Sequence, residues 1–152
     1  MDEVFKNRHS VRIFQNKLVE SEKLEEILEA ANSAPSAGNL RAREIIVVKE
    51  QVVKEKIVKA ARDQDFIAQA PVVLVFCAVP KRSAVKYKER GRDLYAIQDA
   101  TIAASFAWLQ AVILGLSACW VGAFTEEEIK EILQIKETWQ PVAILPIGYA
   151  GE

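Results

Sequence analysis

The stretch from Ala100 to Thr125 contains no charged residue, and it constrains the fold more than any other part of the chain. A segment this long and apolar is either a membrane span or a helix buried on all sides. Ser105 and Gln110 interrupt it, Gly115 breaks it, and the SACWVGAF sequence that follows is typical of a strand and loop. The flanking lysines and arginines show no membrane-anchoring pattern. We therefore expect a buried helix, covered in part by a second subunit, and no membrane segment.

Length and charge limit the classes of protein to consider. With 152 residues the chain has the size of one domain, so we expect a single domain over residues 1–152. Its 20 lysines and arginines against 21 aspartates and glutamates give a net charge of -1, which excludes the global basic field of a general nucleic-acid binder. Any anionic ligand must therefore be bound locally, by a small group of residues.

The cysteine and histidine content argues against metal or thiol chemistry. Cys77 and Cys119 lie in apolar surroundings without a CxxC motif, and His9 is the only histidine. These residues supply no metal-ligand set and no triad beyond what His9 offers. The N-terminal MDEVFKNRHS lacks the apolar core of a secretory signal. We expect a cytoplasmic protein with buried thiols, in which Cys119 is packed and not a nucleophile.

Apolar spacing predicts three shorter helices. Ser21 is expected to cap a helix whose apolar residues follow the i, i+3, i+4, i+7 pattern and which ends before Pro35. Residues 51–62 return to helical spacing. Thr125 and Glu128 have the spacing of a capping box, which predicts a helix from Glu126 to about Leu133.

Three apolar segments predict strands. Residues 45–48 are β-branched, residues 72–79 form a continuous apolar run typical of a strand buried on both faces, and residues 142–147 form the last strand. The basic segment 80–92 is expected to be an exposed loop or an irregular helix start. It either attracts the phosphates of a ligand or is a solvated face, and the latter is the commoner case. Helices that alternate with short strands indicate a layered α+β or α/β domain.

The segment RHSVRIF (residues 8–14) concentrates donors that suit an anion. On an extended segment Arg8, Ser10 and Arg12 project from one face while Val11 and Ile13 point into the core. Arginine offers a planar fork matched to phosphate oxygens, and a serine hydroxyl can complete the shell. From these residues alone, an arginine pair that bridges nearby glutamates is an equally good interpretation.

Five motifs taken together resemble the FMN-dependent nitroreductase family. They are RHSVRIF near the N-terminus, APSAGN at residues 34–39, FIAQAPVVLVFCA in the middle, GLSACWVGAF, and PVAILPIGY near the end. The resemblance covers nearly the whole chain in order and spacing. It implies an α+β fold, an α/β/α sandwich with a mixed, mainly antiparallel sheet flanked by helices, in an interwoven homodimer with FMN at the subunit interface. It also implies ping-pong transfer of a hydride from NADH or NADPH, through FMN, to an organic acceptor such as a nitroaromatic or a quinone.

The resemblance carries over to particular residues. Arg8 and Ser10, with His9 beside them, match the family's phosphate contacts. Arg12 matches a cation near the pyrimidine edge of the flavin, where it would favour the reduced anion. Gln64 matches an amide that faces the ring. No side chain is expected to be catalytic, since the flavin itself carries the chemistry.

Two further segments complete the expected site. Residues of the WVGAF motif match the segment beside flavin N5, and residues of APSAGN match a loop that reaches the flavin from the partner subunit. The first set is Val121, Gly122 and Ala123, and the second is Pro35, Ser36, Ala37 and Asn39. Taken singly, APSAGN is also compatible with a helix C-terminal turn, and WVGAF with the end of a strand.

The chain departs from the family pattern in three places. Many members follow the asparagine with Leu-Gln-Pro-Trp, whereas here Asn39 is followed by LRAR, which affects the substrate side of the site. The chain is short for the family, and it ends at Glu152 without a basic residue after the Gly-Tyr strand. We therefore expect modest FMN affinity. The alternative function is a flavin-binding protein with a structural or regulatory role.

Overall fold

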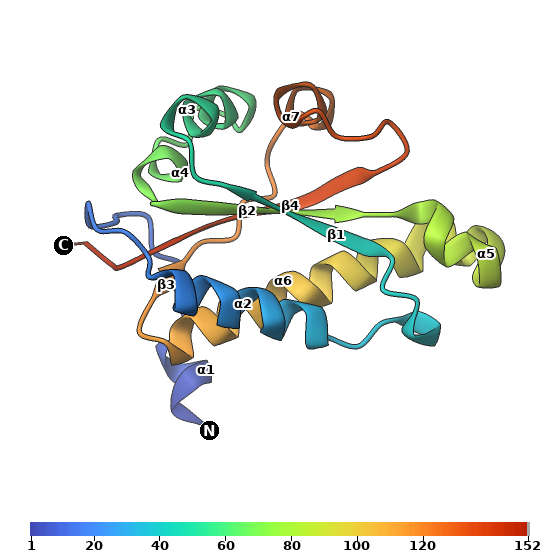
Figure 1. The fold of residues 1–152 in the computed structure, drawn as a ribbon, viewed down its shortest axis with the longest axis horizontal. Helices are drawn as coiled ribbons and strands as arrows, with labels where there is room; N and C mark the ends of the chain where they lie inside the picture. The colour runs from blue at the N-terminus through green and yellow to red at the C-terminus, as the bar shows by residue number, and fades with distance from the viewer. Residues whose placement is uncertain (152) are drawn as a thin grey trace.

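The centre of the molecule is a four-stranded antiparallel sheet. A computed structural model describes residues 1–151, and its strand order is β1-β2-β4-β3 (Figure 1). The strands are β1 (Arg43–Val48), β2 (Val72–Ala78), β3 (Ser117–Ala118) and β4 (Gln140–Gly148). The three strands predicted from apolar segments correspond to β1, β2 and β4, and β3 is the short strand expected after Gly115.

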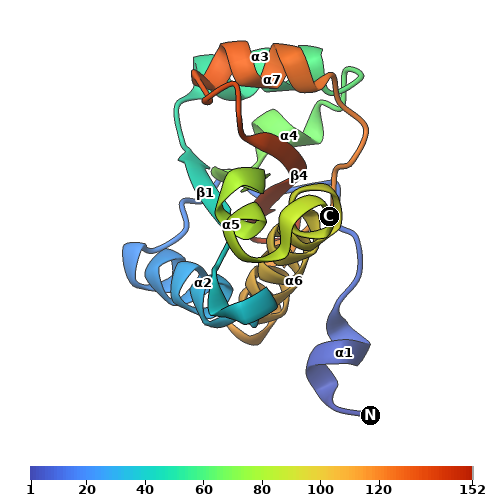
Figure 2. The ribbon, with the colours of Figure 1, turned by 90° about the vertical axis from the view of Figure 1, so that its right-hand side faces the viewer.

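Helices cover both faces of the sheet, as Figure 1 and Figure 2 show. α2 (Ser21–Ser33) and α6 (Ala96–Ile113) lie on one face, and α3 (Gln51–Ala60), α4 (Phe66–Gln69) and α7 (Glu126–Leu133) lie on the other. The short α1 (Glu3–Asn7) packs against α6, and α5 (Pro80–Arg90) leads through a π-helical turn, η2 (Gly91–Tyr95), into α6. The expected α/β/α sandwich is confirmed.

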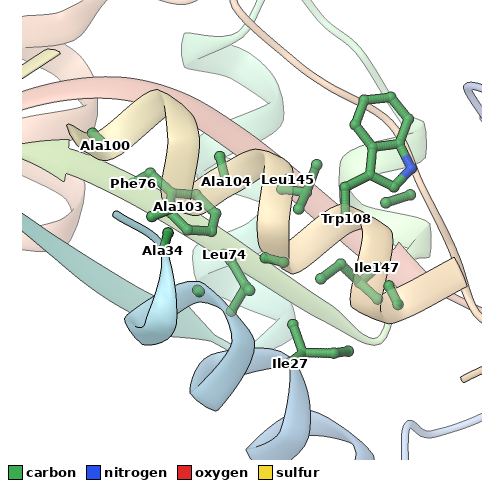
Figure 3. Packing of buried hydrophobic residues seen from close by; sticks show 14 of the residues in the cluster. Ile27, Ala34, Leu74, Phe76, Ala100, Ala103, Ala104, Trp108, Leu145 and Ile147 are labelled. Carbon is green, nitrogen blue, oxygen red and sulfur yellow. The ribbon is translucent and has the colours of Figure 1, made fainter. Parts of the chain in front are cut away.

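β2 is buried along its whole length because it lies between two cores. Leu74 and Phe76 pack into the core formed with α2 and α6, whereas Val73 and Val75 pack into the core beneath α3 and α7. Figure 3 shows the first core, where Ala103 and other fully buried alanines of α6 let that helix lie close to the sheet. A strand covered on both faces has no polar side, which explains its continuous apolar sequence.

α6 buries one face in the protomer and exposes another. Its buried residues pack against α2 and the sheet. A second apolar stripe at helical spacing consists of Ile102, Phe106, Leu109 and Ile113. Phe106 (37%) and Ile113 (62%) are exposed, Leu109 is half-buried, and Ile102 is half-buried against the first core. The continuous helical stretch Pro80–Ile113 is long and apolar enough, by length and composition alone, to cross a membrane. Its packing makes α6 a core helix of this fold.

Gly115 ends α6 as predicted. Its φ of 79° lies in the left-handed region that favours glycine. The amide of Leu116 donates to the Ala111 carbonyl (2.8 Å) and that of Gly115 to the Val112 carbonyl (3.0 Å). This pair of bonds is a Schellman motif, and it turns the chain sharply from α6 into β3.

The capping hydrogen bonds predicted at the start of α2 and α7 are absent from the described residues. α2 is capped by Glu20, and Ser21 is its first helical residue. α7 has the predicted bounds, yet the Thr125 side chain makes no capping hydrogen bond. Packing against the sheet decides where these helices begin, so local cap chemistry is not required. The basic segment is the predicted irregular helix, since Lys88 has a φ of 52° within α5.

Candidate functional site

The donor-rich segment 8–14 is tied to the sheet at its two ends. The Val11 amide donates to the Ala118 carbonyl in β3 (3.1 Å), and Ser10 forms a parallel bridge with Ala118. Phe14 pairs with Ala150 beyond β4. The Ile13 carbonyl also accepts from the Gly151 amide (2.7 Å). These separate contacts hold the segment along the sheet edge without making it a regular strand.

The expected alternation of side chains therefore holds only in part. Val11 is buried, as predicted, but Ile13 is 53% exposed and Phe14 takes the buried position instead. The prediction for Ile13 is wrong because the chain changes direction between its bridges to Ala118 and Ala150, which breaks the two-residue period. Arg8, Ser10 and Arg12 remain accessible to a ligand.

Both arginines of this segment rest on aromatic rings. The Arg8 guanidinium lies 4.7 Å from the ring centroid of Trp108 in α6, and that of Arg12 lies 6.0 Å from the ring of Phe66 in α4. Within residues 1–151 neither arginine has a carboxylate within 4.0 Å. The interpretation of these arginines as a glutamate-bridging pair is therefore wrong for the described chain.

The neighbours of Arg8 supply further donors. His9 is exposed, and its Nδ1 donates to the Asn7 carbonyl (2.9 Å), which leaves Nε2 free. The Ser10 hydroxyl is exposed. Trp108 is 9% exposed, and its buried indole Nε1 has no hydrogen-bond partner within the described residues. Accessible arginine and serine donors fit an anion such as a phosphate.

A second part of the site joins Gln64 to the segment 121–123. The Gln64 Nε2 donates to the carbonyls of Ala61 (2.8 Å) and Ala123 (3.3 Å). Val121 is anchored by two backbone bonds with Ile144 of β4, at 2.9 and 3.0 Å. Gly122 and Ala123 are exposed. Their backbone is therefore rigidly held and open to a planar ligand.

The third part, residues 35–39, lies elsewhere in the same chain. It includes the 3-10 turn η1 (Ala37–Asn39), with Pro35 and Asn39 exposed and Ser36 and Ala37 half-buried. This loop follows the C-terminal end of α2, a helix of 13 residues that spans about 20 Å, whereas segment 8–14 precedes its N-terminal end (Figure 1). The loop and the arginines do not meet within one chain.

Sequence reasoning missed three residues near these segments. Asp99 is 2% exposed, and its carboxylate accepts from the amides of Ala37 (3.2 Å) and Ala42 (3.0 Å). Arg43 is 4% exposed and donates to three carbonyls at the end of α2. Trp108, whose ring lies under the Arg8 guanidinium, is the third. The available signal was a lone aspartate at the edge of the uncharged stretch.

The cysteines stand apart from this site. Burial raises the pKa of the Cys77 thiol to about 12. Cys119 is buried, and its Sγ lies 3.7 Å from the Trp120 carbonyl. The prediction that both thiols are buried is confirmed.

A cleft of about 910 Å³ lies between residues 14–18 and the helices α3 and α4. None of the predicted site residues lines it. Its one deeply buried charge, Lys54, donates to the Ala70 carbonyl (2.7 Å) and so closes the end of α4. Burial lowers the pKa of Lys54. Volume alone therefore does not identify the functional site.

The fold is a helix-flanked antiparallel sandwich, and two accessible arginines, Arg8 and Arg12, lie on the segment that follows one sheet edge. Comparison with known proteins agrees with this class. The family model described as "Nitroreductase family" matches residues 5–64 and 58–149. The chain belongs to the nitroreductase family, and the resemblance found in its motifs is confirmed.

Individual relatives match over nearly the whole chain. An FMN reductase [NAD(P)H] from Bacillus subtilis is 32% identical over 168 residues, covering 100% of this chain and 68% of the relative. An NADH dehydrogenase from Thermus thermophilus is 31% identical, covering 95% of this chain and 84% of that protein. The structure of an FMN-dependent nitroreductase from Clostridium difficile superposes with a TM-score of 0.86 at 32% identity, covering 98% of this chain and 87% of that one.

Proposed function

We propose that this protein is an FMN-dependent oxidoreductase that uses NADH or NADPH to reduce an organic acceptor such as a nitroaromatic or a quinone. The observation that carries the proposal is the pair Arg8 and Arg12, which rest on aromatic rings and have no carboxylate partner within residues 1–151. Family membership and relatives named for FMN and NAD(P)H support the choice of cofactor and donor. FMN, when bound, supplies the chemistry by accepting a hydride and returning two electrons to the acceptor.

Arg8 and Ser10 would hold the FMN phosphate. A guanidinium that lies with one face on an indole keeps its N–H edge directed outward, so it can form a bidentate contact with phosphate oxygens. The Ser10 hydroxyl and the neighbouring His9 add donors on the same short segment.

Arg12 and Gln64 would face the flavin ring. Negative charge develops at the pyrimidine edge when a flavin is reduced, and a fixed cation there stabilises that state. The ring of Phe66 supports the Arg12 guanidinium. Gln64 donates to the Ala123 carbonyl, and this bond orders the exposed backbone of Gly122 and Ala123, from which an N–H would reach the reactive nitrogen of the flavin.

The site would be completed by a second copy of the chain. Loop 35–39 and segment 8–14 lie at opposite ends of α2, so a shared site explains how both sets contact one flavin. The exposed Phe106 and Ile113, with the half-buried Ile102 and Leu109 on the same side of α6, support a homodimer, because a two-fold related copy would cover this stripe. We propose a cytoplasmic homodimer with FMN at its interface.

Anaerobic mixing with NADH and with NADPH tests the proposal. An enzyme loses its flavin absorbance at a rate that rises with donor concentration, and recovers it when a quinone or a nitroaromatic is added. During one cycle NAD(P)H loses a hydride and becomes NAD(P)⁺. The acceptor gains the two electrons and one proton of that hydride, and a second proton from water. A protein that binds FMN without turnover would keep its oxidised spectrum with both donors, and that result would contradict the proposal.

A further inference from the structure

The loop between α2 and β1 has an unfavourable backbone shape. Gly38, Asn39 and Arg41 all have positive φ values, 61°, 56° and 49°. For residues other than glycine this region is sparsely populated, although asparagine enters it more readily than most, so such residues persist where their surroundings hold them there. Two of the three are not glycine. The loop must therefore be held by contacts from outside it.

Asp99 supplies the central contact. One carboxylate oxygen, Oδ1, accepts from the Ala37 amide near the start of the loop (3.2 Å), and the other, Oδ2, accepts from the Ala42 amide at its end (3.0 Å). The side chain comes from α6, a helix that packs against α2 and the sheet, so its position is rigid. One buried carboxylate thus joins both ends of the loop to the core.

The charge of Asp99 also balances a buried arginine. Burial lowers the pKa of Arg43, and the nearby Asp99 carboxylate opposes that shift. Arg43 Nη2 donates to the carbonyls of Ala31 (3.3 Å), Asn32 (3.1 Å) and Ala34 (3.0 Å), which closes the end of α2 just before the loop. Within residues 1–151 the Nε and Nη1 of Arg43 are buried without a hydrogen-bond partner, so backbone carbonyls satisfy only part of its charge. The nearby negative charge of Asp99 offsets part of the remaining cost.

The loop is also held from its outer side. The Arg82 Nη1 in α5 donates to the carbonyls of Arg41 (2.8 Å) and Arg43 (3.2 Å), and its Nη2 pairs with Glu44 (2.7 Å). The Ser36 hydroxyl accepts from the Arg41 amide (2.9 Å). The loop is thus held by two side chains, Asp99 from the buried side and the partly exposed Arg82 from the outer side.

We infer that Asp99 is a positioning residue for the flavin site of the partner subunit: it bridges the amides of Ala37 and Ala42 and so presents Pro35 to Asn39 to a flavin held by the other chain. This inference rests on the proposed function, because that function places the loop at the partner's flavin. Asp99 itself touches no flavin. Asp99 acts through loop 35–39 of its own chain. It therefore affects the flavin that is held by Arg8 of the other chain, and not the flavin held by Arg8 of its own chain.

Asp99→Asn tests this role directly. Asparagine has the same shape but only one acceptor oxygen. It can therefore accept from only one of the amides of Ala37 and Ala42, and its NH₂ group faces the other amide N–H, donor against donor. We expect the affinity for flavin to fall by roughly ten-fold, equally for FMN and riboflavin, because the loop does not hold the phosphate. The matched control is Asp93→Asn, since Asp93 is exposed and contacts only Arg92. Wild-type flavin affinity in Asp99→Asn would overturn the inference.

Subunit exchange separates positioning from a general folding defect. Two variants are mixed at an FMN concentration at which the wild type is loaded and each variant alone is mostly empty, and the FMN that the mixture binds is measured. Random pairing of complementary variants restores about a quarter of the sites. Arg8→Ala with Asn39→Ala is the control for the shared site itself. Arg8→Ala with Asp99→Asn should recover to the same extent, whereas Asn39→Ala with Asp99→Asn should not, because both changes then affect the loop.

Each outcome of the exchange has one meaning. If the control pair recovers and the Asn39→Ala with Asp99→Asn pair recovers equally, Asp99 does not act through the loop and the inference is wrong. If subunits exchange and the control pair does not regain FMN, the site is not shared between two chains. In that case the proposed function is wrong on this point, and so is the role of Asp99 across the interface. Should Asp99→Asn not fold, Arg82→Ala weakens the same loop from the surface. It should complement Arg8→Ala and fail with Asn39→Ala, and the opposite pattern would overturn the inference.

Discussion

The Arg8 guanidinium lies over the Trp108 indole, with 4.7 Å between the arginine Cζ and the ring centroid. This contact joins the residue that follows α1 to the C-terminal half of α6. Stacking occupies the face of the guanidinium and leaves its N–H edge for an oxyanion. Arg8 is therefore already oriented before a ligand binds, which lowers the entropic cost of ordering it.

Replacement of Arg8 should affect FMN and riboflavin differently. In Arg8→Ala we expect FMN binding to weaken by roughly 1.5–3 kcal/mol, the range for hydrogen bonds to charged groups, with riboflavin binding nearly unchanged. Arg8→Lys keeps the charge but loses the bidentate fork, so it should fall between the two. Fluorescence titration with both ligands measures the difference. Equal losses for the two ligands would remove the phosphate assignment.

Trp108 should increase the affinity for FMN indirectly, by orienting the Arg8 guanidinium. Trp108→Phe retains a ring of similar character but weakens the cation–π contact and removes the unpaired indole N–H. We expect a loss of about 0.5–1 kcal/mol in FMN binding, with little change for riboflavin. Trp139→Phe is the matched control, because that ring contacts Lys136. A loss that is the same for riboflavin would show that Trp108 acts on the fold and not on the phosphate.

Arg12 should set the electronic properties of the flavin. Removal of a cation at the pyrimidine edge destabilises the reduced anion, so Arg12→Gln should lower the reduction potential of the bound FMN. Equilibration with redox dyes on fully loaded protein gives the potential. Arg90→Gln, which alters an arginine beside Tyr95, serves as the control. An unchanged potential in Arg12→Gln would give Arg12 a structural role instead.

Cys77 should make stability fall at alkaline pH. Burial raises its pKa from 9.0 to about 12, so the folded protein keeps the thiol proton that the unfolded chain loses. The unfolded state then binds fewer protons, and stability is complete below about pH 9 and falls as the pH rises towards 12. Urea unfolding across this window should give a flatter pH dependence for Cys77→Ala than for wild type. Parallel dependences would contradict the assigned burial effect.

Regular elements were predictable from the sequence, and the contacts between distant segments were not. α7 has the predicted bounds of Glu126 and Leu133 because its pattern is local. Ile13 was misplaced because the turn at that residue depends on pairing with residues near the C-terminus. Asp99 was missed because its partners, Ala37 and Ala42, are about 60 positions away, and nothing in a local pattern reveals them.

The faces of α6 were another property that only packing decides. Because the sequence of α6 is apolar on all sides, it does not distinguish Ala104 and Ala111 from Phe106 and Ile113 as interface positions. The structure buries both completely inside the protomer and leaves Phe106 and Ile113 outward. A charge at Ala104 or Ala111 would therefore disrupt the core of one chain, and tests of the interface belong at Phe106 and Ile113.

If the flavin site requires two chains, the loss of the dimer and the loss of FMN must occur together. Size-exclusion chromatography with light scattering and flavin absorbance measures both quantities in one experiment. Wild-type protein should elute at the mass of a dimer with FMN in the same peak. Ile113→Glu places a charge in the exposed stripe, so mass should fall to that of a monomer and FMN should be lost together. Val52→Glu, at an exposed position on α3, should change neither. A monomeric peak that retains a stoichiometric amount of FMN would contradict the claim that the site requires two chains.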